Sequence, residues 1–246
     1  MNSQRIVALV KINLKKLIRE PSYLFLMLLF PAVLTVVFGI SFSDPELGMD
    51  FNIMASGLFA YACIFIIMTV AMSFTDEREH GLLKRINITP MTSGEFMGSH
   101  IISNMAIAIV QMIVILILAF LFGFKPLCNV VGFILAFLII ELFALSSIGL
   151  GLITATIAKT AGAATGLSFI FILPQMFFGT FIPLSDTTRI IATFIPSYYV
   201  TDALISIFRG DILTSKNILI DLAVISIVSV IIVIIGIQLF KRYGYK

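Results

Sequence analysis

Charged residues are scarce in this sequence. Only 12% of the 246 residues are charged, whereas 60% are hydrophobic and the mean hydropathy is +1.13. An ordinary soluble domain is about 25% charged and about 45–50% apolar. A chain of this length cannot bury so much apolar surface in a water-soluble core, so we expect an integral membrane protein in a lipid bilayer. Its cations stand beside apolar runs and form no basic face, which argues against a nucleic-acid partner.

Residues that hold metals or form disulfides are also few. The two cysteines, Cys63 and Cys128, lie far apart and lack the spacing of a metal site. Two cysteines are too few for a disulfide framework. The two histidines, His80 and His100, do not belong to an H-E-x-x-H motif. We therefore expect no metal site.

Motifs of nucleotide hydrolysis and nucleophilic catalysis are missing as well. The sequence contains no G-x-x-x-x-G-K-[ST] and no G-x-S-x-G. No pair of acidic residues inside the apolar runs indicates a protease or a proton relay. We expect a chain that is not an enzyme and binds no cofactor itself. If it transports, another subunit must supply the energy.

Long apolar runs dominate what is present. A helix that spans a hydrocarbon core of about 30 Å needs about 20 apolar residues, and six segments meet this requirement. Pro31, inside the first segment, is a tolerated kink. The runs predict an all-α membrane protein with six transmembrane helices in a single transmembrane domain, residues 1–246. The six segments are Ser22–Ser41, Ile53–Thr75, Phe96–Gly123, Val130–Ile157, Ala161–Thr180 and Ile218–Phe240.

Residues 1–21 predict a separate amphipathic helix. Their cations are spread along the segment, which is unlike the charged start of a signal peptide. Such a helix lies in the headgroup plane with its Lys and Arg side chains toward anionic lipid. The apolar positions that recur at helical spacing are Ile6, Val10, Leu14 and Leu17.

The distribution of cations predicts the orientation of the chain. If both termini are cytoplasmic, twelve of the 16 lysines and arginines lie on the inner side and four on the outer side. Inner loops of membrane proteins are enriched in these residues, and an even number of spans agrees with two inner termini. We expect a multi-pass protein of the cell membrane with the 74–98 segment in the cytoplasm.

That segment is the one long charged stretch between two apolar runs. It begins with acidic residues and continues with basic ones, which suits a short helix with a complemented dipole. Leu82, Leu83 and Ile86 would form an apolar ridge on it. Pro90 stops the helix, and Thr92 with Glu95 fits a capping box that starts the next one.

The same segment resembles the first cytoplasmic loop of the ABC-2 type transporter permeases. The resemblance lies in Glu77-Arg78-Glu79, Gly81, Thr89-Pro90, Glu95 and Gly98. It implies that residues 76–91 form a coupling helix and loop that dock on a separate ATPase subunit, which would use ATP and Mg²⁺. The alternative is a solvated inner loop with ordinary capping. The residues implied in docking are Glu77, Arg78, Glu79, Gly81, Leu82, Leu83, Thr89 and Pro90.

A second stretch, residues 181–217, is too polar for a span and too long for a turn. We expect two short helices there that dip into the outer leaflet as a re-entrant hairpin, the alternative being an ordinary amphipathic outer loop. Its motifs, F-x-P-L and P-x-x-Y-x-x-D-A-L, resemble the same family, although Ile205 stands where the family often has Arg. The residues concerned are Pro183, Pro196, Tyr199 and Asp202.

Three polar residues inside the spans are candidates for a translocation path. Glu141 is the acidic residue well inside an apolar run, where an ionised carboxylate must face other helices or water. Gln111, at similar depth, is its expected partner, and Gln175 follows Pro174 in the fifth span. The alternative is a set of hydrogen bonds between helices. Gly162 and Gly166 form a G-x-x-x-G motif that permits close helix contact.

The resemblance implies the permease subunit of an ATP-driven transporter that works as a dimer with a second permease subunit. Export of a hydrophobic or amphipathic small molecule, drug-like or antibiotic-like, is the first expectation. Export of a lipid-linked glycan is the next. A sensor or scaffold that moves nothing and an intramembrane enzyme built around Glu141 remain alternatives from other classes.

Overall fold

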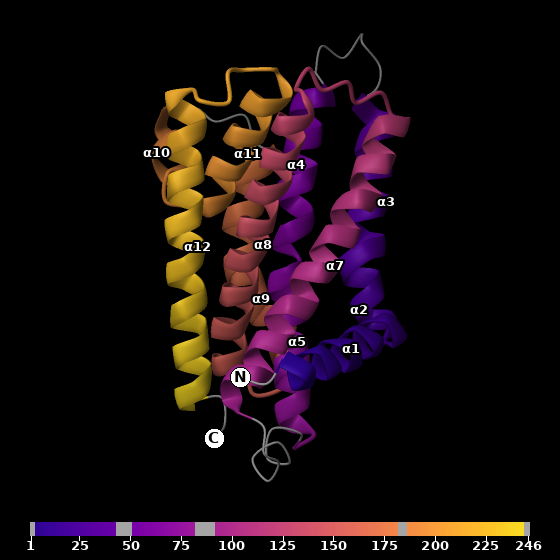
Figure 1. The fold of residues 1–246 in the computed structure, drawn as a ribbon, viewed down its shortest axis with the longest axis vertical. Coiled ribbons are helices and arrows are strands. Elements are labelled where there is room, and N and C mark those ends of the chain that lie inside the picture. The colour runs from indigo at the N-terminus through magenta and orange to yellow at the C-terminus, as the bar shows by residue number, and fades with distance from the viewer. Residues whose placement is uncertain (1–2, 43–50, 82–91, 182–185, 244–246) are drawn as a thin grey trace.

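The computed structural model describes residues 3–42, 51–81, 92–181 and 186–243, and the regular elements in these ranges are all helices. Figure 1 shows a bundle of long helices, with α1 (Ser3–Arg19) lying across one end and α10 (Asp186–Ala192) at the opposite end. We call these the α1 end and the α10 end. The predicted all-α architecture is confirmed.

Five helices are long and apolar enough to cross a membrane. They correspond to the second to sixth predicted segments, and the fourth has the predicted bounds. The chain is therefore a multi-pass membrane protein. In element order they are α4 (Phe51–Ile64) continued by α5 (Ile66–Glu79), α7 (Ser93–Leu121), α8 (Val130–Ile157), α9 (Ala161–Met176) continued by the π-turn η3 (Phe177–Phe181), and α12 (Lys216–Tyr243).

The first predicted span is built differently from the others. It consists of α2 (Pro21–Leu24), a π-helical turn η1 (Phe25–Leu29) and α3 (Phe30–Phe42), and its shorter apolar helix is Met27–Ser41. In the π-turn the Phe30 N–H donates to Phe25 O, one residue further back than in an α-helix. The wide turn ends two residues before Pro31, whose ring and missing N–H disturb an α-helix. Six spans therefore stay a prediction.

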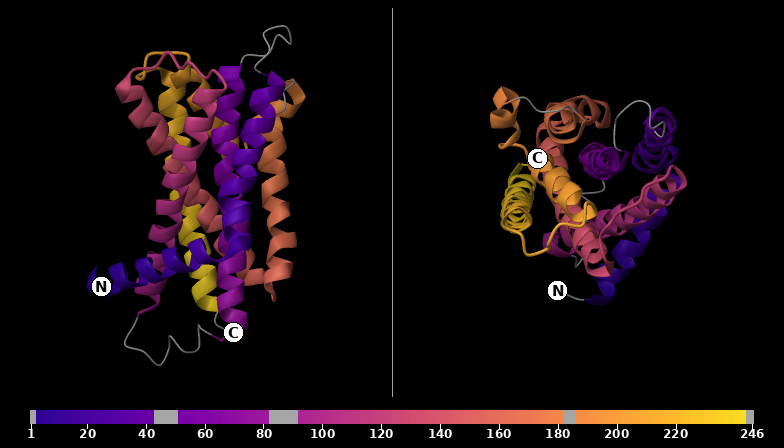
Figure 2. Two further views of the ribbon diagram at one scale, coloured as in Figure 1. Left: turned by 90° about the vertical axis from the view of Figure 1, so that its right-hand side faces the viewer. Right: turned by 90° about the horizontal axis from the view of Figure 1, so that it is seen from above.

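The α4–α5 helix is the centre of the bundle. In the most apolar stretch of each helix, 89% of the residues are buried in α4–α5, 28% in α12 and 22% in α9. Buried Phe rings of α4, α11 (Pro196–Phe208) and the α7–α8 link meet near the α10 end: Phe59 and Phe124 lie 5.9 Å apart, and Phe124 and Phe208 lie 5.0 Å apart. Figure 2 shows α1 crossing the foot of this bundle.

Glycines bring α8 and α12 into backbone contact. A Cβ atom on Gly236 of α12 would lie 2.6 Å from the Gly149 carbonyl oxygen of α8, and one on Gly149 would lie 2.8 Å from the Val233 nitrogen. Such approaches need residues without side chains. By contrast, a Cβ atom on Gly162 or Gly166 would meet no atom within 4 Å, so the G-x-x-x-G motif makes no close contact within the described chain.

Two short helices, α10 and α11, occupy the predicted outer segment at the α10 end (Figure 1). Pro196 is the first residue of α11, where its missing N–H costs nothing. The Tyr199 hydroxyl donates to Thr193 O at 2.8 Å and so holds α11 to the link from α10. Asp202 is half-buried on α11. Pro183 lies outside the described residues, and insertion of this hairpin into a leaflet stays a prediction.

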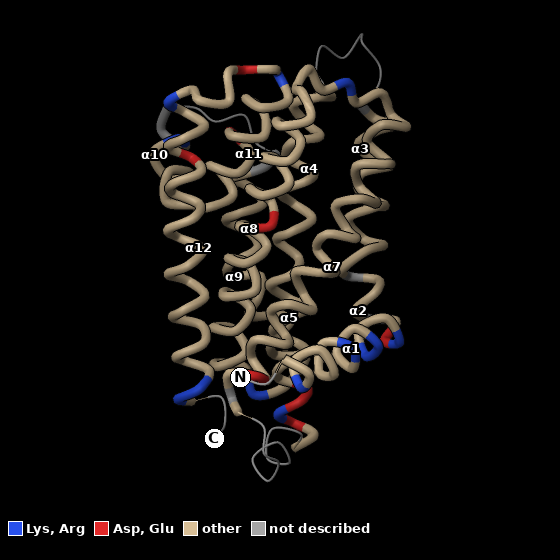
Figure 3. Tube along the Cα trace, viewed as in Figure 1, with Lys and Arg blue, Asp and Glu red and all other residues tan. Residues whose placement is uncertain are grey.

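Charged positions gather at the two ends of the bundle, as the tube in Figure 3 shows. Several blue positions lie on α1 and at the adjoining end of α12. The α1 end also holds the last turn of α5. Which end faces the cytoplasm, and whether α1 lies in a headgroup layer, stay predictions.

Candidate functional site

The last turn of α5 contains the charged residues that the sequence singled out. The span was expected to end at Thr75 and a separate short helix to follow, but α5 continues to Glu79. That boundary is wrong because the backbone hydrogen bonds run on through the charged residues: the His80 N–H donates to Asp76 O at 3.0 Å. Gly81, at φ +70°, then ends the helix in a left-handed conformation that glycine adopts readily.

Half of the predicted docking residues can be placed. Glu77, Arg78, Glu79 and Gly81 lie at the end of α5. The others lie outside the described residues, and with them the expected apolar ridge. These are Leu82, Leu83, Thr89 and Pro90.

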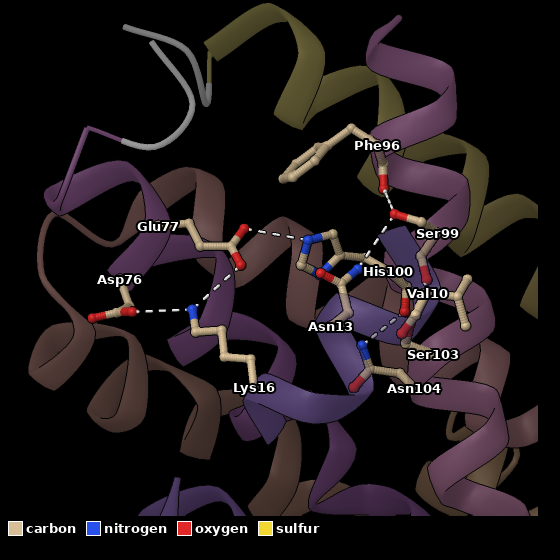
Figure 4. Close-up of polar contacts among 10 residues, drawn as sticks. All are labelled: Val10, Asn13, Lys16, Asp76, Glu77, Phe96, Ser99, His100, Ser103 and Asn104. Carbon is tan, nitrogen blue, oxygen red and sulfur yellow. Dashed lines mark hydrogen bonds and ion pairs between the residues drawn. The ribbon is translucent and has the colours of Figure 1, made fainter. Parts of the chain in front are cut away.

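The Glu77 side chain of α5 contacts two other helices, through Lys16 of α1 and His100 of α7 (Figure 4). Its carboxylate lies 3.3 Å from the Lys16 ammonium of α1 and 3.3 Å from the His100 Nε2 of α7. Lys16 also lies 3.2 Å from the carboxylate of Asp76. Glu77 is only 5% exposed, whereas the Lys16 and Asp76 side chains are partly exposed, so water reaches one side of the cluster. Removing one partner should therefore destabilise the cluster, by less than the loss of a partner from a fully buried pair because the Lys16 side chain is 24% exposed.

Aromatic packing fixes the His100 ring in this site. The ring centroid lies 4.5 Å from that of Phe74 on α5 and 4.6 Å from that of Phe96 on α7. Phe74 in turn packs on Phe240 of α12 at 4.9 Å. His100 is 3% exposed, so its imidazole has little freedom to turn away from Glu77.

A polar seam holds α1 on α7 beside the ion pairs. The Asn13 side-chain amide donates to the Ser99 hydroxyl at 3.3 Å. The Ser103 hydroxyl lies 3.5 Å from Val10 O and donates to Ser99 O at 2.7 Å. Figure 4 shows these residues between the two helices. The amphipathic helix α1 is therefore fastened to the bundle through its own buried polar residue as well as through Lys16.

The next two residues of α5 contact the α8–α9 turn. The Arg78 guanidinium donates to the Ala158 carbonyl at the C-terminal end of α8. The Glu79 carboxylate accepts from the Ala161 N–H at the N-terminal end of α9, at 3.3 Å. A cation at a helix C-terminus and an anion at an N-terminus both complement the helix dipole. The short turn between α8 and α9 is therefore held by α5.

The predicted capping box at the start of α7 is confirmed. The Glu95 N–H donates to the Thr92 hydroxyl at 3.2 Å, and the Thr92 N–H donates to the Glu95 carboxylate at 3.0 Å. This box fixes where α7 begins and hence the height of His100 on it. The last turn of α5, α1, the start of α7 and the α8–α9 turn thus form one connected polar cluster, which we call the α5 junction.

The predicted pairing of Gln111 with Glu141 is wrong. Gln111 donates instead to the Ala62 carbonyl of α4 at 2.9 Å. Both carboxylate oxygens of Glu141 are enclosed and have no hydrogen-bond partner among the described residues. Gln175 donates to Phe171 O of its own helix at 3.4 Å, and its backbone carbonyl accepts from the Ser197 hydroxyl of α11 at 2.9 Å. No described contact brings these three candidates together.

The sequence did not predict that Lys16 and His100 belong to this site. Lys16 stands among other cations of α1 and was assigned to lipid headgroups with them. His100 follows Glu77 by 23 positions, on another helix, so no spacing connects them. The signal that could have directed attention to His100 was its position in the first turns of an otherwise apolar helix. Among the described residues no group of three or more His, Cys, Asp or Glu could hold a metal.

Comparison with known families identifies the family of the chain. The family model described as "ABC-2 type transporter" matches residues 4–208, which include α1, the α5 junction and all of α11. A search of curated proteins finds no match. The matched stretch covers well over half of the chain, and the chain therefore belongs to the ABC-2 type transporter family.

Proposed function

We propose that this chain is the permease subunit of an ATP-driven exporter and pairs with a second permease subunit. The family already implies a transport role in a membrane beside an ABC ATPase subunit. The observation that supports the mechanism is the α5 junction, in which Glu77, Arg78 and Glu79 contact α1, α7 and the α8–α9 turn. The α1 end would face the cytoplasm, in line with its cations.

The α5 junction supports a route for force from the ATPase. Residues 82–91 follow the last turn of α5 directly, so an ATPase subunit that displaces this loop would displace α5 first. Because Glu77 is held by both Lys16 and His100, α1 and α7 would move with it. Arg78 and Glu79 would carry the α8–α9 turn along. The partner subunit, which binds ATP and Mg²⁺, would do the hydrolysis.

Six spans complete this proposal. From Pro21 to Phe42 the helical turns α2, η1 and α3 follow one another without a gap. These 22 residues extend about 33 Å at 1.5 Å per residue, which matches a hydrocarbon core of about 30 Å. Two such subunits would enclose a shared path between them. A hydrophobic or amphipathic small molecule, drug-like or antibiotic-like, is the cargo that suits these mostly apolar helices.

Co-purification tests the docking part of the proposal. The chain is expressed with a candidate ABC ATPase subunit, and the ATPase recovered with the permease is measured. We expect the double variant Glu79→Ala with Leu83→Ala to lose most of the ATPase, whereas Lys11→Ala, at an exposed cation of α1, retains it. Equal recovery with the double variant and with the unchanged chain would contradict docking on residues 76–91.

Flux separates a transporter from a scaffold that transmits force and moves nothing. The co-purified complex is placed in liposomes, and the ATP-dependent movement of a fluorescent amphipathic dye across the membrane is followed. We expect dye movement that depends on ATP and stops in the docking variant. ATP hydrolysis by an intact complex with no movement of any dye in a chemically varied set would favour the scaffold.

A further inference from the structure

One enclosed carboxylate inside the bundle has no ion-pair partner among the residues that the structure describes. Both oxygens of Glu141, on α8, are enclosed and lack a hydrogen-bond partner among the described residues. The sequence has no lysine or arginine at 20–77, 86–124 or 126–158, which include all of α4, α7 and α8. An ionised carboxylate in a membrane core is costly unless a positive group or donors compensate it. Any compensating cation must therefore come from outside these helices.

A second unsatisfied acceptor lies at a similar height on α7. Gln111 of α7 is 1% exposed, and its side-chain oxygen has no partner among the described residues, while its amide nitrogen donates to Ala62 of α4. Next to Ala62, the Cys63 sulfur lies 4.0 Å from the carbonyl oxygen of Ile140, the residue before Glu141. α4 thus contacts α7 and α8 at two adjacent positions. We call the level of Ala62, Cys63, Gln111 and Glu141 the Glu141 layer.

This layer lies near mid-depth in the bundle. α4 begins, α7 ends and α8 begins at the α10 end, where the Lys125 N–H of the α7–α8 link donates to the Asn52 side chain at 2.8 Å. Counted from there, the polar residues are about 10–12 positions along their helices, or about 15–18 Å at 1.5 Å per residue. A hydrocarbon core is about 30 Å thick, so water is far from this layer on either side.

The chemistry of the unsatisfied atoms selects the ligand. The two Glu141 oxygens and the Gln111 oxygen are all acceptors, and a protonated amine supplies both a positive charge and several N–H donors. The α8 residues next to Glu141 in the sequence, Ile139, Ile140 and Phe143, are apolar and fully buried, and an apolar helix of this kind favours a ligand with an apolar body. Leu138, one turn before Glu141, is 48% exposed, so this side of α8 reaches the lipid-facing surface.

We propose that the Glu141 layer binds the protonated amine of a lipophilic cation, which enters from the surrounding lipid and pairs with Glu141. This inference rests on the proposed export function and narrows its cargo from amphipathic molecules in general to lipophilic amines. Glu141 would hold the charge, and the Gln111 oxygen would accept one further N–H. Ala62 keeps the Gln111 amide nitrogen occupied, which leaves that oxygen available.

Equilibrium binding without the ATPase tests this site. The purified chain is placed in phosphatidylcholine nanodiscs and titrated with 9-aminoacridine, a fluorescent amine that is cationic at neutral pH. Acridine, which has nearly the same shape but is mostly neutral there, is the matched ligand, and empty nanodiscs give the background. We expect 9-aminoacridine to bind at least about tenfold more tightly than acridine, because a desolvated ion pair adds to the shared apolar contacts.

Three variants assign the effect to Glu141. Glu141→Gln keeps the shape but removes the charge, and we expect it to lose at least about tenfold in affinity for 9-aminoacridine and less than about twofold for acridine. Glu141→Asp keeps the charge and should retain more binding than Glu141→Gln. Asp221→Asn, at a buried acid of α12 near the α10 end, should bind as the unchanged chain does. Each variant must show the elution profile of the unchanged chain.

Two results would overturn the inference: equal affinity of the unchanged chain for the two ligands, or unchanged amine binding by Glu141→Gln. Either result would mean that the Glu141 carboxyl group is protonated and binds no cationic ligand. Because no ATPase is present, these results are independent of the co-purification test. If the ATPase docks but the chain shows no preference for the amine, the cation site is refuted and the proposed function stands. If the amine binds but the ATPase does not dock, the proposed function is refuted and the cation site stands.

Discussion

The ion pairs around Glu77 allow a quantitative test of the α5 junction. Glu77→Gln removes the carboxylate charge but retains the shape of the side chain, and Lys16→Met removes the ammonium but retains an apolar stem. If the two groups form a pair across α1 and α5, as their 3.3 Å separation shows, the double variant should be little worse than the more damaging single one. Lys11→Met, at an exposed cation on the same helix, is the control.

The expected size follows from the burial of the two side chains. At 3.3 Å and an effective dielectric constant of about 20, two unit charges attract by about 5 kcal/mol. Desolvation offsets much of this: the Glu77 side chain is 6% exposed, whereas that of Lys16 is 24% exposed and partly screened. We expect a coupling energy of about 1–3 kcal/mol. For a chain of this size, about 2 kcal/mol lowers the Tm by about 4–8 °C.

Thermal unfolding in detergent micelles with a coumarin maleimide dye measures this loss. The buried Cys63 thiol, 1% exposed, reacts only when the bundle opens, and a Cys128→Ser background removes the partly exposed thiol. The four chains of the double-mutant cycle are compared in this background. Additive effects of the two single variants, within about 0.5 kcal/mol, would refute the pairing. Lys11→Met should leave the Tm unchanged.

Three further predictions concern other parts of the chain. Gly236→Ala should cost about 1–3 kcal/mol of stability, because its Cβ would lie 2.6 Å from Gly149 O. Gly162→Ala would meet no atom within 4 Å and should be neutral or stabilising. A comparison of the Tm values of the two variants checks both. Thr92→Ala should cost about 1 kcal/mol through loss of the capping box, which the same assay measures, and an unchanged Tm would contradict it. Burial raises the pKa of the Cys128 thiol, so less thiolate is present at neutral pH. An impermeant maleimide added outside intact cells should label Cys128 slowly at neutral pH and progressively faster as pH rises, and labelling only after permeabilisation would reverse the proposed orientation.

Local patterns predicted much of this structure. A long, mostly apolar run between Asn129 and Ala158 predicted α8 with its observed ends, because a helix that spans a bilayer needs about 20 apolar residues. The Thr92–Glu95 capping box was predictable because its two hydrogen bonds lie within four residues. Features that depend only on residues close together in the chain could therefore be predicted from the sequence.

Contacts between helices could not be read in this way. Gln111 and Glu141 do lie at similar depth, but which helix a side chain faces depends on the rotation of that helix, and Gln111 faces Ala62 instead. The end of α5 was misplaced because charge usually marks the end of a span, whereas Lys16 compensates Glu77, His100 contacts it, and the helix continues. Both residues come from distant parts of the chain.

The close approach of α8 and α12 restricts which motions are open to the chain. With the Gly236 Cα lying against the Gly149 carbonyl, the two helices cannot slide past each other without a collision of their backbones. If Arg78 of α5 pulls on the Ala158 carbonyl at the end of α8, α12 should therefore move together with α8. Neither Arg78 nor Ala158 belongs to α12 itself. Bending must occur elsewhere, and the wide π-turns beside Pro31 and after Pro174 are the softer places for a hinge.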